Sequence, residues 1–174
     1  MLASIKTLFN SFMEICLFRL GPQDLPASNI FLTIVFVISI LLALLLNLIN
    51  LSFQHAVLAM MINITVVIII TWLILRLYNK PMRFIQTLTA QMGAGVVISV
   101  VAAPVIVMLV YAEEHDVDMT AAIVLWLGLF IWELAVTAHI LRHALSTTFL
   151  QGFLMAILYP LIYFQLIDFL IPTQ

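Results

Sequence analysis

Charged residues are scarce in this chain of 174 residues: only 8% are Asp, Glu, Lys or Arg, against about 25% in an ordinary soluble domain. Apolar residues make up 66%, where soluble domains have about 45–50%. Six basic and eight acidic side chains are too few to cover the surface of a soluble domain of this size. The composition excludes a soluble or disordered protein and predicts a polytopic membrane protein.

Other shortages exclude classes of site. The net charge of −2 offers no basic surface for nucleic acid. A single cysteine, Cys16, excludes an intrachain disulfide and a zinc or iron–sulfur site built on several cysteines. The chain has no G-x-S-x-G, no phosphate-binding P-loop and no G-x-G-x-x-G. We therefore expect a protein that is not an enzyme and that holds no cofactor.

Long charge-free windows locate the membrane spans. Residues 25–75 contain no Asp, Glu, Lys or Arg, and about 20 residues suffice to cross the hydrocarbon layer. Polar residues near position 50 divide this window into two spans joined by a tight turn. The chain as a whole predicts an all-α membrane domain over 21–174, with five spans near 29–49, 56–77, 88–111, 119–140 and 146–169.

The basic residues test the number of spans independently. In a five-span arrangement all six lie on one side of the membrane: Lys6, Arg19, Arg76, Lys80, Arg83 and Arg142. Positively charged loops remain in the cytoplasm. This pattern predicts a cytoplasmic N-terminus and a C-terminus on the opposite side, which is the periplasm where the membrane is a bacterial inner membrane.

The first 20 residues have a different pattern, which predicts an amphipathic helix lying in the membrane interface. Apolar residues recur at three- and four-residue spacing, and Gly21-Pro22 follows as a helix stop. The apolar arc consists of Leu2, Ile5, Leu8, Phe9, Phe12, Met13 and Cys16. Cys16 is therefore either a buried thiol or, at the membrane surface, a site of palmitoylation.

Small residues mark one face of the third span. Gly95, Ser99 and Ala103 are four residues apart, so they share a face that lets a neighbouring helix approach closely. This face is either a packing surface within the bundle or a dimer seam. Pro104 and Pro160 predict kinks in the third and fifth spans.

Polar amides punctuate the first two spans. Asn47, Asn50 and Asn63 are of a kind that forms hydrogen bonds between membrane helices. Such bonds hold helices together more often than they serve transport. We expect these residues to join the first two spans.

Glu133 is the one ionisable side chain well inside a predicted span. An ionised carboxylate costs about 2.5–3.5 kcal/mol at the centre of a membrane helix, so it is expected to face the bundle. Thr137 lies one helical turn further on the same face. Glu133 is either a proton or cation site, or a carboxyl that hydrogen-bonds another helix or reaches the interface.

His139 and His143 lie one turn apart on one face of the fourth span. This spacing is able to hold a metal ion or haem. No second cluster in the sequence supplies further ligands. The alternative interpretation is a pair of interfacial anchors at the cytoplasmic end of the helix.

Several of these features together resemble a known family. Gly21-Pro22 before the first span, five spans, and Gly95, Ser99 and Pro104 in the third span resemble the Yip-domain (Ypt-interacting-protein type) membrane proteins. The resemblance covers roughly residues 15–170. The short N-terminal segment is more similar to small proteobacterial members than to eukaryotic ones. The resemblance implies a helical, non-enzymatic membrane fold and supplies no catalytic residue.

Two functions follow as hypotheses. The first is a scaffold, assembly or accessory subunit that contacts the lipid bilayer and other membrane proteins or a second copy of the chain. The alternative is a small transporter or cofactor-bearing subunit that uses Glu133 with the His139/His143 pair. Such a site requires these groups to converge on a polar cavity between spans.

The topology generates the first testable prediction. Reporter fusions at residues 80 and 142 are expected to report a cytoplasmic position, because both lie in basic segments. Fusions at residue 115 and at the C-terminus are expected to report the periplasm. A cytoplasmic C-terminus would show that the number of spans is wrong.

Overall fold

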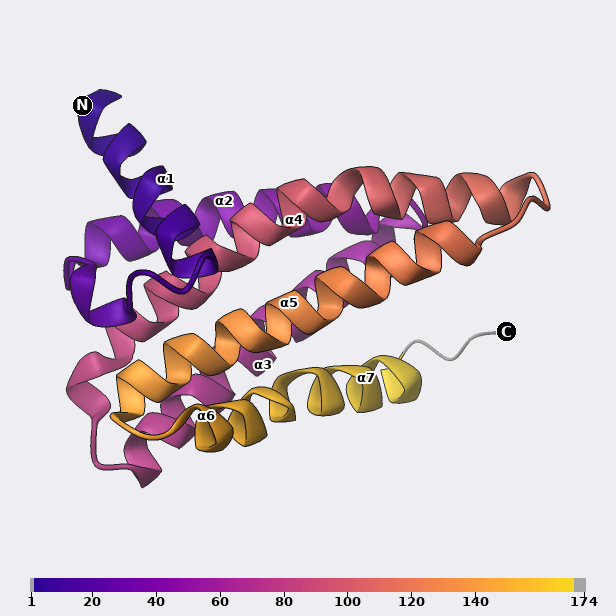
Figure 1. The fold of residues 1–174 in the computed structure, drawn as a ribbon. Helices are drawn as coiled ribbons and strands as arrows, with labels where there is room; N and C mark the ends of the chain where they lie inside the picture. The colour runs from indigo at the N-terminus through magenta and orange to yellow at the C-terminus, as the bar shows by residue number, and fades with distance from the viewer. Residues whose placement is uncertain (1, 171–174) are drawn as a thin grey trace.

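The computed structural model describes residues 2–170, with side chains from residue 9 onward, and within this range the protein is helical without β-strands (Figure 1). The helices are α1 Leu2–Cys16, η1 Pro22–Asp24, α2 Asn29–Asn47, α3 Phe53–Leu77, η2 Pro81–Arg83, α4 Phe84–Glu114, α5 Thr120–Leu145, α6 Phe149–Ala156 and α7 Leu158–Leu170.

Five helical segments are long and apolar enough to cross a membrane, as predicted. They are Asn29–Asn47, Phe53–Leu77, Pro81–Glu114, Thr120–Leu145 and Phe149–Leu170. The third and fourth segments extend beyond the predicted limits at their charged ends. Charge-free windows underestimate the lengths of these helices, because long charged side chains at a helix end extend out of the apolar layer while the helix continues.

The two prolines inside the spans have different effects. α4 continues through Pro104 as one helix. The fifth span divides into α6 and α7 at Ile157, three residues before Pro160. Proline has no N–H to donate to the carbonyl of Ala156, and its ring crowds that carbonyl. The kink predicted from Pro160 thus corresponds to an interruption of the helix at Ile157.

Four helix ends turn through residues with positive φ, and none of these residues is glycine. They are Phe18, Asn79, Asp116 and Ser146, with φ between 52° and 63°. At each end the following amide bonds back to a carbonyl five residues earlier, as in Arg19 N–H to Glu14 O at 2.8 Å. Asn and Asp tolerate this conformation, whereas Phe18 is a bulky residue held in a strained one.

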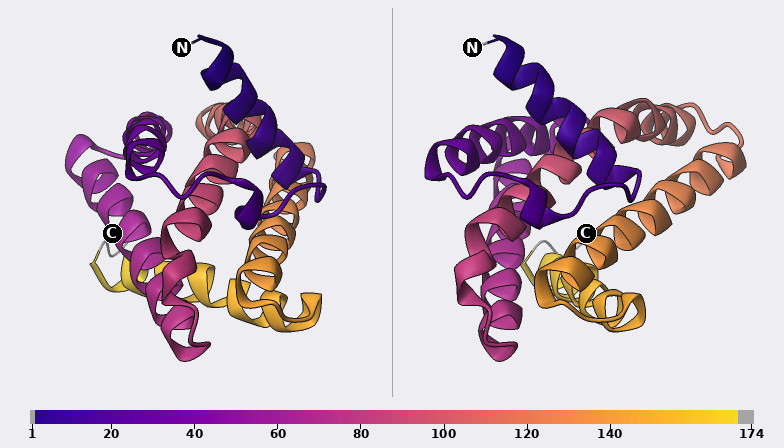
Figure 2. Two further views of the ribbon diagram at one scale, coloured as in Figure 1. Left: turned by 90° about the vertical axis from the view of Figure 1, so that its left-hand side faces the viewer. Right: turned by 60° about the vertical axis from the view of Figure 1, so that its left-hand side comes forward.

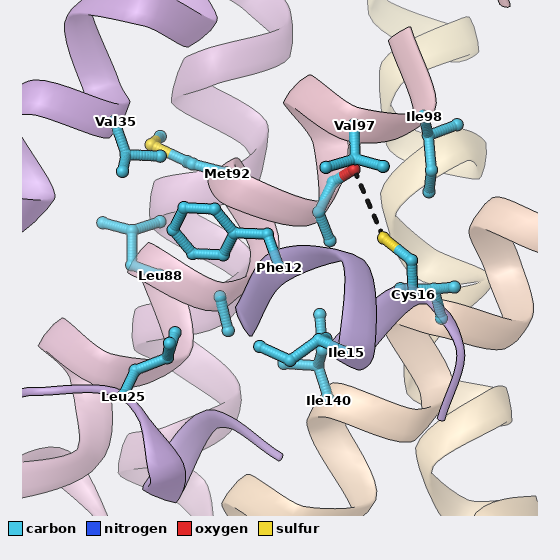
Figure 3. Close-up of a cluster of buried hydrophobic side chains, with 13 residues drawn as sticks. Phe12, Ile15, Cys16, Leu25, Val35, Leu88, Met92, Val97, Ile98 and Ile140 are labelled. Atoms are coloured by element: carbon cyan, nitrogen blue, oxygen red, sulfur yellow. Dashed lines mark hydrogen bonds between the residues drawn. The ribbon is translucent and has the colours of Figure 1, made fainter. Parts of the chain in front are cut away.

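α1 crosses over α4 near one end of the bundle (Figures 1 and 2). Phe12, Ile15 and Cys16 are buried among α4 and α5 side chains such as Val97 and Ile140 (Figure 3). The amphipathic pattern therefore predicts the helix and two of its buried side chains, Phe12 and Cys16. The bundle covers these two residues, whereas Phe9 on the same arc is half exposed.

Hydrogen bonds fasten the chain between α1 and α2 onto the bundle. The Trp132 indole N–H donates to the Cys16 carbonyl at 3.0 Å, which satisfies an open carbonyl at the end of α1. His139 Nε2 donates to the Leu20 carbonyl at 2.8 Å. Gln86 Nε2 donates to the Leu25 carbonyl at 2.7 Å. Three otherwise unpaired backbone carbonyls thereby gain partners from the spans.

Cys16 behaves as a buried thiol. Its side chain is fully buried, and Sγ lies 3.8 Å from the Ala94 carbonyl oxygen. Burial raises the pKa of the thiol from 9.0 to about 12. At neutral pH the thiol is protonated and has no access to a modifying enzyme.

We expect Cys16 to resist maleimide at pH 8 in the folded protein and to react after denaturation. The raised pKa alone lowers the thiolate fraction roughly 10³-fold. As pH rises above about 9, the unfolded thiol ionises first, so the folded state loses stability in that range. Cys16→Ala/Leu17→Cys, which moves the thiol to an exposed position, is the matched control. Equal labelling of both proteins would contradict the buried position.

Candidate intramembrane binding site

A cavity of about 440 Å³ lies between the spans, and all five contribute to its lining. Its polar residues come from α2, α3, α4, α5 and α7. They are Ser39, Asn47, Asn63, Gln91, Ser99, Glu133, Thr137, Tyr159 and Tyr163. Polar groups from several helices meeting inside a membrane bundle are typical of a ligand or ion pathway.

Glu133 faces this cavity without a partner. Its carboxylate makes no hydrogen bond or ion pair within residues 2–170. Thr137, one turn further along α5, also lines the cavity, which confirms the predicted shared face. The hydrogen bond from Glu133 to another helix that one interpretation required is not found in this range. An unpaired carboxylate in such a place favours a positively charged ligand or a proton.

Aromatic rings surround the remaining wall. Trp126 and Phe130 lie on the same face of α5 as Glu133, and their rings stack with centroids 5.6 Å apart. Tyr163 and Phe164 of α7 contribute further rings. Aromatic faces attract cations, with tryptophan the strongest. The site therefore combines one negative charge with several surfaces suited to an organic cation.

A closed ring of hydrogen bonds supports one side of the cavity. The Thr71 hydroxyl donates to Gln91 Oε1 at 2.6 Å, and Gln91 Nε2 donates to the Tyr159 hydroxyl at 3.0 Å. Because the Thr71 proton is already used, Tyr159 donates to Thr71 Oγ1 at 3.0 Å. The ring joins α3, α4 and α7 and fixes Tyr159 and Gln91 where they line the cavity.

The histidine pair does not join this site. His139 Nε2 donates to the Leu20 carbonyl, and its ring meets the Phe18 ring edge-on with the ring centroids 5.3 Å apart. His143 lines a separate pocket at the end of the bundle. Since residues 133 and 139 are six apart, they lie on different faces of α5. Neither histidine lines the cavity with Glu133, so the convergence that the alternative hypothesis requires is not found. Within residues 2–170 no three His, Cys, Asp or Glu side chains gather as a metal site.

The small-residue face of α4 is not the close-packing surface that its spacing predicted. Gly95 and Ser99 line the cavity, and a Cβ added at Gly95 would meet no atom within 4 Å. Ala103 is only partly buried. Close approach occurs instead at Gly93, against the Phe12 ring, and at Gly152, against the backbone of α5. Spacing identifies a shared face but not what lies opposite it.

Sequence reasoning missed Gln91 and Tyr159 and misassigned the asparagines. Asn47 and Asn63 line the cavity, and their side chains make no hydrogen bond in the described range, so they do not join the first two spans. Asn50 lies exposed in the turn. An inventory of uncharged polar residues inside the predicted spans would have included Gln91 and Tyr159, because burying a polar group in an apolar layer is costly.

Comparison with family models, with curated proteins and with solved structures returned no match to this chain. The class that the fold defines is a helical protein with five segments suited to spanning a membrane. The likeness to Yip-domain proteins stays a prediction.

Gly152→Ala is expected to destabilise the protein, because the new Cβ would lie 2.5 Å from the Ala138 carbonyl oxygen and 3.1 Å from the backbone nitrogen of Arg142. Overpacking of this kind costs about 1–3 kcal/mol. Gly95→Ala is the matched control, since its Cβ would enter the cavity. Thermal melting in detergent should fall for the first variant only, and equal melting of both would contradict these placements.

Proposed function

We propose that this chain is a non-enzymatic membrane protein that binds a small organic cation, such as an alkyl- or arylammonium ion, as a transporter or binding subunit. The observation that carries the proposal is the unpaired Glu133 carboxylate in a cavity to which all five spans contribute. A volume of about 440 Å³ lies within the range of small-molecule sites.

The chemistry of the lining favours an organic cation over other positive ligands. A metal cation such as Ca²⁺ or Mg²⁺ takes six or more oxygen ligands, several of them carboxylates, whereas Glu133 is the only acid in this lining. A bound proton alone would not require a cavity of this size. An ammonium ion pairs with one carboxylate and places its apolar groups against Trp126 and Phe130.

Placement in a bacterial inner membrane, with the N-terminus in the cytoplasm, is part of the proposal. The distribution of the six basic residues supports it. The Gly21-Pro22 motif and the number of spans support membership of the Yip-domain family as a further proposal.

A scaffold or accessory role is the second candidate, and one observation favours it. The last turns of α1 pack against the bundle, and Figure 1 shows the helix backbone extending away from the spans toward its N-terminus. A projecting helix of this kind provides a binding surface for another membrane protein or a second copy of this chain. This role is compatible with an occupied cavity.

The purified protein is expected to bind the fluorescent cation ethidium saturably, as measured by anisotropy in detergent. Glu133→Gln should weaken binding roughly tenfold or more, because removing the charged partner of an ion pair leaves only neutral contacts. Glu113→Gln, an exposed acid at the end of α4, is the matched control and should bind like the parent.

Both variants should melt close to the parent, since Glu133 has no hydrogen-bond partner to lose in the described range. Absence of saturable binding by the parent, or equal binding by Glu133→Gln, would contradict the organic-cation site.

A further inference from the structure

A second pocket, here called the basic pocket, lies at the end of the bundle where α5 turns into α6. Its volume is about 510 Å³, and it shares no lining residue with the cavity. Its cationic side chains are Arg83, from the 3₁₀ turn before α4, and Arg142, from the end of α5; the imidazole of His143 also lines it. None of the described residues that line it is acidic. The pocket therefore concentrates positive charge in a protein of net charge −2.

Arg83 is held in place by only one of its nitrogens. Nη1 donates to the carbonyls of His143 and Ala144, at 3.1 and 2.8 Å, and to the Ser146 hydroxyl at 3.0 Å. These bonds cap the C-terminus of α5. The other two guanidinium nitrogens form no hydrogen bond in the described range. Arg83 is thus oriented and still has donors to offer.

The side chain of Arg142 has no hydrogen-bond or ion-pair partner within residues 2–170. Its Nε is buried without a hydrogen bond, and no other side-chain nitrogen or oxygen in this range is in that state. Leaving a buried charged donor unpaired is costly, and the two Nη atoms of Arg142, which also form no hydrogen bond in this range, remain accessible to an anion in the pocket. The unpaired guanidinium group of Arg142 is the strongest indication that the pocket has an occupant.

Helix α6 adds further donors. It begins at Phe149, with Thr148 as its N-cap. Thr148 Oγ1 accepts the Gln151 N–H at 3.4 Å, and the amides of Phe149 and Leu150 have no acceptor in the described range. Ser146, Thr147 and Thr148 bring hydroxyl groups to the same pocket. Helix N-termini and arginine side chains together form the usual environment of a bound phosphate.

Asp24 is the acidic residue whose charge acts on this pocket, because it interacts electrostatically with His143. Its Oδ2 already accepts the Gly21 N–H at 2.8 Å, and Asp24 does not line the pocket. Within residues 2–170 it forms no ion pair with Arg83 or Arg142.

We infer that the basic pocket binds a phosphate group, carried either by a membrane lipid headgroup or by a soluble phosphate. The pocket lies at the end of the spans, at headgroup depth for a protein that crosses the membrane. Phe149 lines it and is 42% exposed, and the next residue, Leu150, is 67% exposed. These apolar side chains beside the phosphate donors suit the acyl region of a lipid.

The test uses Arg142→Gln, because Arg142 makes no hydrogen bond that the fold depends on. Arg76→Gln is the matched control, as Arg76 lies over the Trp72 ring and away from the pocket. One arm measures retention of phosphatidylglycerol and phosphatidylcholine by native mass spectrometry. The other measures the melting temperature in sodium phosphate against sodium chloride at equal ionic strength.

The parent and Arg76→Gln should retain phosphatidylglycerol or gain stability in phosphate, and Arg142→Gln should weaken that response roughly tenfold or more in ligand concentration. Lipid retention without a phosphate effect identifies the headgroup as the ligand, and the reverse identifies a soluble phosphate. No response in either arm, or an unchanged response of Arg142→Gln, would overturn the proposal. Neither arm depends on ethidium binding, so the two sites are tested separately.

Discussion

The two faces of α5 determine how the rest of the molecule is arranged. One face carries Trp132 and His139, seven residues apart, which bind backbone carbonyls at the end of α1 and in the segment that follows. Open carbonyls are costly in an apolar environment, so this face fixes α1 against the bundle. The other face carries Glu133 and Thr137 and opens onto the cavity. One helix therefore both closes the N-terminal side of the fold and supplies the acidic group of the site.

The cavity lies between regions of the bundle where the helices pack closely. Close helix contacts occur at Gly152 against α5 and at Gly93 against Phe12. The hydrogen-bonded ring of Thr71, Gln91 and Tyr159 joins three helices beside the cavity. Rigid contacts on either side allow polar side chains to face an open volume. This arrangement is the usual form of a preorganised binding site.

The class of fold and the number of spans follow from the sequence because charge and apolar run length decide membrane insertion. The sequence does not reveal which helix faces pack against each other. Gly95 and Ser99 share a face as predicted, yet only the fold shows that a cavity lies opposite. His139 is one turn from His143, but a carbonyl far away in the chain, at Leu20, determines its role. Glu133 was recognised because a charge at that depth is costly, whereas uncharged Gln91 and Tyr159 gave a weaker signal.

The central claim is that the cavity holds an organic cation beside Glu133. The most direct measurement is an experimental structure of the protein with a bromine-labelled arylammonium ion, located by the anomalous scattering of bromine. The account predicts the ion within the cavity, with its nitrogen at ion-pair distance from the Glu133 carboxylate and its ring against Trp126 or Phe130. A cavity filled by a lipid acyl chain, or a bromine signal only at the protein surface, would contradict it.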